Sequence, residues 1–333
     1  MTPHELYMNQ LGKTLPLLRL QEGQPLDKWR ALARQRLREL LGMDQIVPCE
    51  LDFQAEETLD WGDYTRTRFT FQSEPGYRVP GYFCLPKTVG AVCQPPEEKL
   101  RVMVCLQGHS TGMHISLGEA KYPDDEIHGD RDFVKHCIAH GHAAMVIEQR
   151  CFGECGSHPE TGRPNCQHAT MAALLLGRTT LAGRVWDVMR AIDMAEERFS
   201  TGAEYHCMGN SGGGTATWYA AALEPRIAKA MPSCAICGFD ASIGAISHCT
   251  CNYVPGIRRW FDMGDLAGLI APRPLVVVAG TTDRIFPLEA TKETFRLIQS
   301  YYEAAGVPDA CKLYVGAEGH RFYAEAWEDF VTL

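Results

Sequence analysis

Three residues have the types and the chain order that nucleophilic catalysis requires. Ser211 lies between glycines in CMGNSGGGTA (207–216), Asp283 lies in GTTDRIFP, and His320 lies in AEGHRF. A serine hydroxyl attacks a carbonyl carbon efficiently only when a base takes its proton and an acid orients that base. The sequence therefore predicts a triad in which Ser211 is the nucleophile, Asp283 the acid and His320 the base.

The surroundings of Ser211 favour a catalytic turn over a merely flexible one. The run from Gly209 to Gly213 fits G-x-S-x-G, and it follows the apolar segment EYHCMG and precedes TATWYAAALE. A strand before the serine and a helix after it are the context of a nucleophile elbow, whose sharp turn requires small neighbours. Asp283 and His320 each follow a further apolar run, so all three side chains are expected at carboxyl ends of strands. We expect Gly214, outside this motif, to permit close packing of the helix on the sheet.

An oxyanion hole would need two backbone N–H donors beside the nucleophile. Gly212, at the start of the predicted helix, is the first donor. The loop CLQGHSTG (105–112) ends a buried run and is expected to supply the second donor, from His109 or Ser110, with His109 preferred. For His109 the prediction concerns only the amide, because the imidazole can point elsewhere.

Other polar residues are candidates for the pocket or competitors for the base. Glu148, Arg150, His248 and Asn252 are expected to line the substrate site, although Arg150 equally suits a structural ion pair with Glu148 or Glu154. His248 could also be the base. His206 precedes the elbow inside a strand, which favours a packed histidine.

The cysteines raise the question of a metal. Cys234-x-x-Cys237, followed by His248, Cys249 and Cys251, has enough ligands for zinc. The two groups of candidate ligands are unequal, however, and Cys234 and Cys237 end a predicted buried strand. Buried apolar thiols are therefore the simpler interpretation. We expect no metal and no organic cofactor.

The arrangement of apolar runs predicts an α/β fold with a mostly parallel sheet covered by helices on both faces. Residues 1–50 are expected to form an N-terminal helical extension with a helix over 26–43, and residues 51–333 the main domain. Strands over 63–73 and 78–86 alternate polar and apolar residues and are expected to be antiparallel at the sheet edge. Segments 151–180 and 238–265 break the alternation and are expected to be loop insertions at the strand ends.

Composition excludes several function classes. The formal charge of −9 argues against a nucleic-acid partner. The sequence contains no apolar run of about 18 residues, so no membrane span is expected. The start of the chain, MTPHELYMNQLGKTLPLLRL, lacks the pattern of a signal peptide. The 14 cysteines are therefore expected to be reduced thiols in a cytoplasmic protein. The sequence gives no signal of oligomeric state.

The motifs GNSGGG, GTTDRIFP, AEGHRF and CNYVPG, with DLAGLIAPRPL, resemble the bacterial acetyl xylan esterase-like branch of the α/β-hydrolase superfamily, which is related to dienelactone hydrolases. The resemblance runs from about residue 50 to the end of the chain. It implies the same triad and an oxyanion hole formed by the amides of Gly212 and His109. Two differences stand out: Gln107-Gly108 replaces the His-Gly of many hydrolases, and a serine replaces the cysteine nucleophile of dienelactone hydrolases.

The leading hypothesis is a serine hydrolase that cleaves short-acyl esters, such as acetyl esters of a carbohydrate or a similar alcohol. A peptidase or amidase with the same triad is an alternative, although the chain has no repeats of a filtering propeller domain. A non-catalytic binding protein with the hydrolase fold is a further alternative, which the complete set of Ser211, Asp283 and His320 disfavours.

Overall fold

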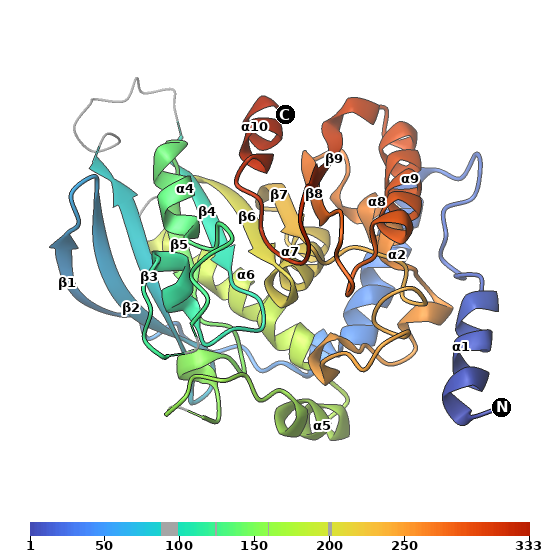
Figure 1. Ribbon diagram of the computed structural model, residues 1–333, viewed down its shortest axis with the longest axis horizontal. Coiled ribbons are helices and arrows are strands. Elements are labelled where there is room, and N and C mark those ends of the chain that lie inside the picture. The colour runs from blue at the N-terminus through green and yellow to red at the C-terminus, as the bar shows by residue number, and fades with distance from the viewer. Residues whose placement is uncertain (88–98, 124, 159, 199–201) are drawn as a thin grey trace.

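A nine-stranded mixed sheet forms the centre of the computed structural model, which describes residues 1–333 except 88–98, 124, 159 and 199–201 (Figure 1). The strand order is β1-β2-β3-β5-β4-β6-β7-β8-β9. The strands are β1 (Gln54–Asp60), β2 (Tyr64–Glu74), β3 (Tyr77–Pro86), β4 (Arg101–Leu106), β5 (Ala143–Ile147), β6 (Glu204–Asn210), β7 (Ile227–Ser233), β8 (Leu275–Gly280) and β9 (Cys311–Gly316).

The pairing confirms the predicted combination of parallel and antiparallel strands. β5, β4, β6, β7, β8 and β9 pair in parallel, whereas β1, β2 and β3 are antiparallel and β3 joins β5. The buried runs of β4, β6 and β8 arise because helices cover both faces of a parallel sheet. β1 was not predicted, because all of its residues are exposed and it carries no apolar alternation.

Two hydrophobic clusters fill the two faces of this sheet. Val102, Val104 and Leu106 of β4 belong to the larger cluster, and Met103 and Cys105 belong to the smaller one. Helices α2, α6, α7, α8 and α9 contribute to the larger cluster, and α4 and α10 to the smaller. The bounds are α2 (Leu26–Leu41), α4 (Phe133–Ala139), α6 (Thr180–Arg198), α7 (Gly212–Leu223), α8 (Ala267–Ile270), α9 (Leu288–Ala304) and α10 (Ala326–Thr332).

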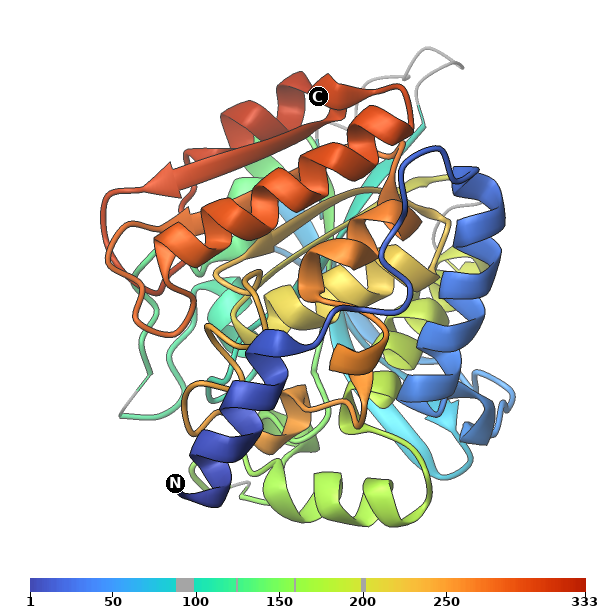
Figure 2. The ribbon, with the colours of Figure 1, turned by 90° about the vertical axis from the view of Figure 1, so that its right-hand side faces the viewer.

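Two helices were not predicted individually. α1 (Pro3–Lys13) packs beside the 238–265 segment, as Figure 2 shows, and residues of both line a cavity of about 340 Å³. α5 (Gln167–Leu175) lies in the segment expected to be a loop. Only one of its residues is buried, so α5 shows no apolar stripe. The helix was not predicted for this reason. The division at residue 50 stays a prediction. Over the described ranges, no helix combines the length and the apolar character needed to cross a bilayer.

Candidate active site

Ser211 occupies a strained turn between β6 and α7. Its backbone has φ 54° and ψ −121°, a combination that costs a residue with a side chain on the order of 1–3 kcal/mol. The Ser211 N–H donates to the carbonyl oxygen of Ser233, at the end of β7, over 2.8 Å. The side chain is half-buried. A strained serine between a strand and a helix is the geometry of a nucleophile elbow.

The glycines around Ser211 are required by close backbone packing. A Cβ at Gly209 would lie 2.5 Å from the carbonyl carbon of Gly213, and one at Gly213 would lie 2.0 Å from the carbonyl oxygen of Leu106. At Gly214 a Cβ would meet the Ser233 carbonyl oxygen at 2.6 Å. The glycine run therefore lets α7 begin against β4 and β7, and Gly214 has the packing role expected for it.

Replacement of Gly213 by alanine is expected to destabilise the protein by about 3 kcal/mol or more, because the added methyl group meets fixed backbone on β4. Thermal unfolding followed by circular dichroism measures the effect. Gly12→Ala in α1 is the control, since its Cβ would lie 3.7 Å from the Asp240 carboxylate in ordinary contact. Equal melting temperatures for Gly213→Ala and the wild type would contradict the packing argument.

His320 and Asp283 form a hydrogen-bonded pair. The Nδ1 atom of His320 lies 2.8 Å from Oδ2 of Asp283, and Oδ1 of Asp283 accepts the N–H groups of Ile285 and Phe286 at 2.8 and 3.0 Å. Burial alone would raise the pKa of Asp283, but His320 and the two amides outweigh it and lower that pKa. The ring of Phe286 stacks on His320 at 6.0 Å between centroids. The carboxylate is thus ionised and holds the imidazole in a fixed orientation.

The order of the strands places this pair and the elbow at the same edge of the sheet. Parallel β6, β7, β8 and β9 are successive neighbours, so Ser211, Asp283 and His320 follow strand ends at one edge of the sheet. Beyond β7, the Cys234 sulfur lies within 4.8 Å of a carboxylate oxygen of Asp283 and a ring nitrogen of His320. His206, another candidate base, hydrogen-bonds to Glu204 and His142 at 2.7 and 3.1 Å, as a packed histidine does.

The loop after β4 passes directly against the elbow. A Cβ at Gly108 would lie 3.0 Å from the Ser211 Cβ, and one at Gly212 would lie 2.7 Å from Nδ1 of His109. The first amides of a helix lack intrahelical partners, so the N–H of Gly212 is suited to bind an oxyanion. The His109 imidazole turns toward the 238–265 segment, where its Nε2 lies 3.1 Å from the Cys251 sulfur.

Of the four predicted pocket residues, His248 and Asn252 lie near the His320 pair. Nδ1 of His248 is 3.1 Å from the side-chain nitrogen of Asn252, and the His248 ring contacts Phe286 edge-on at 6.0 Å. Phe286 thus contacts both His248 and His320. The pKa of His248 is lowered, and burial is the largest cause. A neutral imidazole at this position can line a pocket.

The side chain of Arg150 is held in ion pairs with two other carboxylates. It contacts Asp187 through two hydrogen bonds of 2.8 Å and Glu74 through one of 2.6 Å. The expected ion pair with Glu148 or Glu154 was wrong, because β2 and α6 bring these other carboxylates to the guanidinium. These contacts give Arg150 a structural role.

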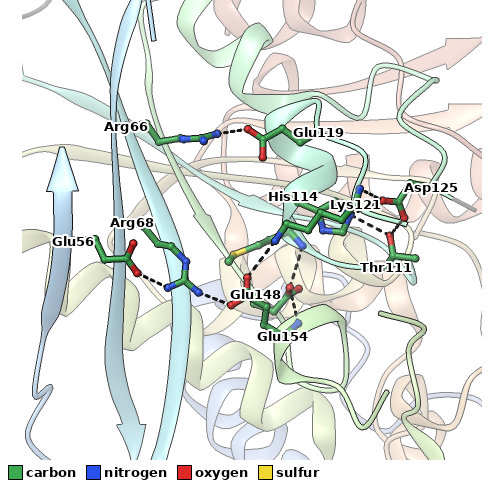
Figure 3. Close-up of polar contacts among 11 residues, drawn as sticks. Glu56, Arg66, Arg68, Thr111, His114, Glu119, Lys121, Asp125, Glu148 and Glu154 are labelled. Atoms are coloured by element: carbon green, nitrogen blue, oxygen red, sulfur yellow. Dashed lines mark hydrogen bonds and ion pairs between the residues drawn. The ribbon is translucent and has the colours of Figure 1, made fainter. Parts of the chain in front are cut away.

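Glu148 is buried and anchors two loops (Figure 3). Its Oε2 accepts the N–H groups of Met113 and Glu154 at 3.1 and 3.2 Å. Glu154 in turn pairs with Arg68 of β2 at 2.5 Å, and Figure 3 shows Arg68 also reaching Glu56. Glu148 therefore positions the loops on either side of it.

A pH-dependent stability is expected from Glu148, because burial raises its pKa to about 7 from an ordinary 4.5. The folded protein binds this proton more tightly than the unfolded chain, so its contribution to the unfolding free energy falls as pH rises from about 4.5 to 7. The total loss is on the order of 3 kcal/mol. Glu148→Gln stays neutral, and urea unfolding between pH 5 and 8 is expected to show its stability rising relative to the wild type. Parallel profiles would contradict this.

A cluster of thiols beside the elbow was not predicted. Cys249 and Cys251 lie together with His109 and Cys166. Cys234, which the sequence analysis weighed with them as a zinc ligand, lies instead by Asp283. The Cys-x-Cys spacing at 249–251 was the available signal, but its partners come from two distant segments that only the tertiary fold brings together.

The sheet, its helices and the elbow together define an α/β-hydrolase fold. No family model matches the chain. Its sequence is 24% identical over 253 residues to YtaP of Bacillus subtilis (strain 168), assigned as a hydrolase, covering 73% of this chain and 78% of the relative.

Solved structures confirm the fold. A Bacteroides fragilis NCTC 9343 protein assigned as an acetyl xylan esterase is similar with a TM-score of 0.74 and 16% identity, covering 95% of this chain and 82% of that protein. A glucuronoyl esterase from Solibacter usitatus is similar with a TM-score of 0.65 and 16% identity, covering 96% of this chain and 98% of the esterase. The resemblance to acetyl xylan esterases therefore holds at the level of the fold.

Proposed function

We propose that this protein is a carboxylic ester hydrolase that acts on short-acyl esters of a carbohydrate, with Ser211 as nucleophile. The observation that carries the proposal is the strained Ser211 turn at the same sheet edge as the 2.8 Å His320–Asp283 pair. Acetyl xylan and glucuronoyl esterases among the structural neighbours support the choice of a carbohydrate ester.

In this mechanism His320 takes the proton from the Ser211 hydroxyl as its oxygen attacks the ester carbonyl carbon. Asp283, ionised and held by two amides, accepts the Nδ1–H hydrogen bond and stabilises the imidazolium. The N–H groups of Gly212 and His109 bind the developing oxyanion, and each such donor is worth about 3 kcal/mol. His320 then protonates the leaving alcohol. Water next attacks the acyl-enzyme while His320 takes its proton, and His320 returns that proton to the Ser211 oxygen as the acid leaves.

Hydrolysis of a panel of substrates tests this function. We expect turnover of p-nitrophenyl acetate and of acetylated xylo-oligosaccharides, with kcat/KM falling as the acyl chain lengthens from acetyl to octanoyl. Methyl esters of glucuronic acid test the second class of neighbour, and aminoacyl p-nitroanilides test the peptidase alternative. A higher kcat/KM on the anilides than on every ester would overturn the proposal in favour of a peptidase.

A further inference from the structure

One imidazole and three thiols converge beside the elbow, and we call His109, Cys166, Cys249 and Cys251 the Cys3His cluster. Their potential ligand atoms all lie within 4.8 Å of one another. Nε2 of His109 is 3.1 Å from the Cys251 sulfur, which is 3.4 Å from the Cys249 sulfur. The residues come from the loop after β4, the start of α5 and the 238–265 segment.

Both the donor types and the spacing match a tetrahedral zinc site. Three cysteines and one histidine are a common structural zinc ligand set. Bond lengths of about 2.3 Å to sulfur and 2.0 Å to nitrogen place tetrahedral ligand atoms about 3.5–3.8 Å apart. The 3.1 and 3.4 Å separations lie just below that spacing, and the outer limit of 4.8 Å lies above it. Small shifts would bring four ligands around one ion.

A buried cation, Arg184, lies directly against the cluster. Its guanidinium is fully buried and donates to the sulfurs of Cys251 and Cys166 at 3.3 and 3.5 Å. Its other contacts are the carbonyl oxygen of Arg150, at 2.9 Å, and the ring of Phe152, and no carboxylate of the described residues pairs with it. A buried cation requires a compensating anion. Cysteine binds zinc as the thiolate, so a zinc ion held by three cysteines carries a net charge of −1. Three thiolates, one zinc dication and the Arg184 cation together are electrically neutral.

We propose that the Cys3His cluster binds one zinc ion. The protein fills all four positions and leaves none for water or substrate, so the ion is structural and takes no part in the ester chemistry. The ion links three segments, namely the loop that contains His109, the start of α5 and the 238–265 segment. Because the His109 ring also lies over Gly212, the ion fixes the oxyanion loop against the elbow.

Metal analysis of the purified protein tests the site. Inductively coupled plasma mass spectrometry of wild type purified under reducing conditions is expected to find about one zinc per chain. Replacement by Co²⁺ is expected to give the intense visible bands of a tetrahedral thiolate site. Folded wild type that contains no zinc and takes up neither Zn²⁺ nor Co²⁺ would overturn the proposal. A disulfide between two of the cluster cysteines, seen as a mass lower by two hydrogens in the native protein, would also overturn it.

Variants assign the ligands. Cys166→Ser and Cys249→Ser are expected to lose zinc or the Co²⁺ thiolate bands. Cys151→Ser is the matched control, because Cys151 is buried in the same cluster of side chains but lies outside the four ligands. Full zinc content in folded Cys249→Ser would contradict the assignment, as would its loss in Cys151→Ser. Ser211→Ala is expected to keep its zinc, so a failure of the esterase proposal is distinguishable from a failure of this one.

Discussion

Ser211→Ala is expected to lower kcat for p-nitrophenyl acetate by about 10⁵–10⁶-fold, because it removes the only atom that forms the acyl-enzyme. The fold should survive, since the N–H of residue 211 still donates to Ser233 and a smaller side chain keeps the strained turn. Stopped-flow absorbance should also lose the burst of p-nitrophenol that accompanies acylation. A residual rate within tenfold of the wild type would contradict a role for Ser211.

Ser233→Ala is the matched control for this experiment. Ser233 is buried beside the elbow, and its hydroxyl donates to the Arg321 carbonyl oxygen at 3.3 Å. Its backbone carbonyl, which holds Ser211, is unchanged by the substitution. We expect kcat within about tenfold of the wild type. A loss as large as that of Ser211→Ala would mean that the region, and not the Ser211 hydroxyl, governs activity.

Asp283→Asn is expected to lower kcat by about 10⁴-fold. Asparagine keeps an oxygen for the amides of Ile285 and Phe286, so the turn stays intact. The group that faces Nδ1 of His320 becomes a neutral amide, which no longer stabilises the imidazolium or holds the reactive tautomer. Steady-state hydrolysis of p-nitrophenyl acetate measures the loss.

Asp262→Asn provides the corresponding control. Asp262 caps a short helix and accepts the N–H groups of Met263 and Phe239 at 2.9 and 3.1 Å, which asparagine can also accept. Activity within about twofold of the wild type is expected. If Asp262→Asn lost activity and Asp283→Asn kept it, the acid of the triad would have to be reassigned.

Sequence patterns predicted the parts of this protein whose role in the fold is visible in residues close together in the chain. The sequence predicted an elbow from the buried run of β6, the glycines and the helix after them. The glycines are a clear signal because close backbone packing tolerates no larger residue at those positions. Asp283 and His320 were predicted in the same way, and each lies on a turn after an apolar strand. The helix and strand signals near them are strong because parallel strands are buried on both faces.

Features decided by long-range contacts could not be predicted. β1 is polar and exposed and is a strand only because β2 offers it an edge. The ion pairs of Arg150 with Asp187 and Glu74 depend on how α6 crosses β2, which no local pattern records. The same is true of Cys166 and His109, which meet only in the folded chain.

Whether Ser211 is an activated nucleophile is tested most directly by a fluorophosphonate, which reacts covalently with activated serine hydroxyls. Wild-type protein and the Asp283→Asn variant are incubated with the probe, digested and mapped by mass spectrometry. We predict one adduct per wild-type chain, on the peptide that contains Ser211, and labelling about 10⁴-fold slower in the variant. Folded wild-type protein that stays unlabelled, or that carries its adduct on another serine, would contradict it.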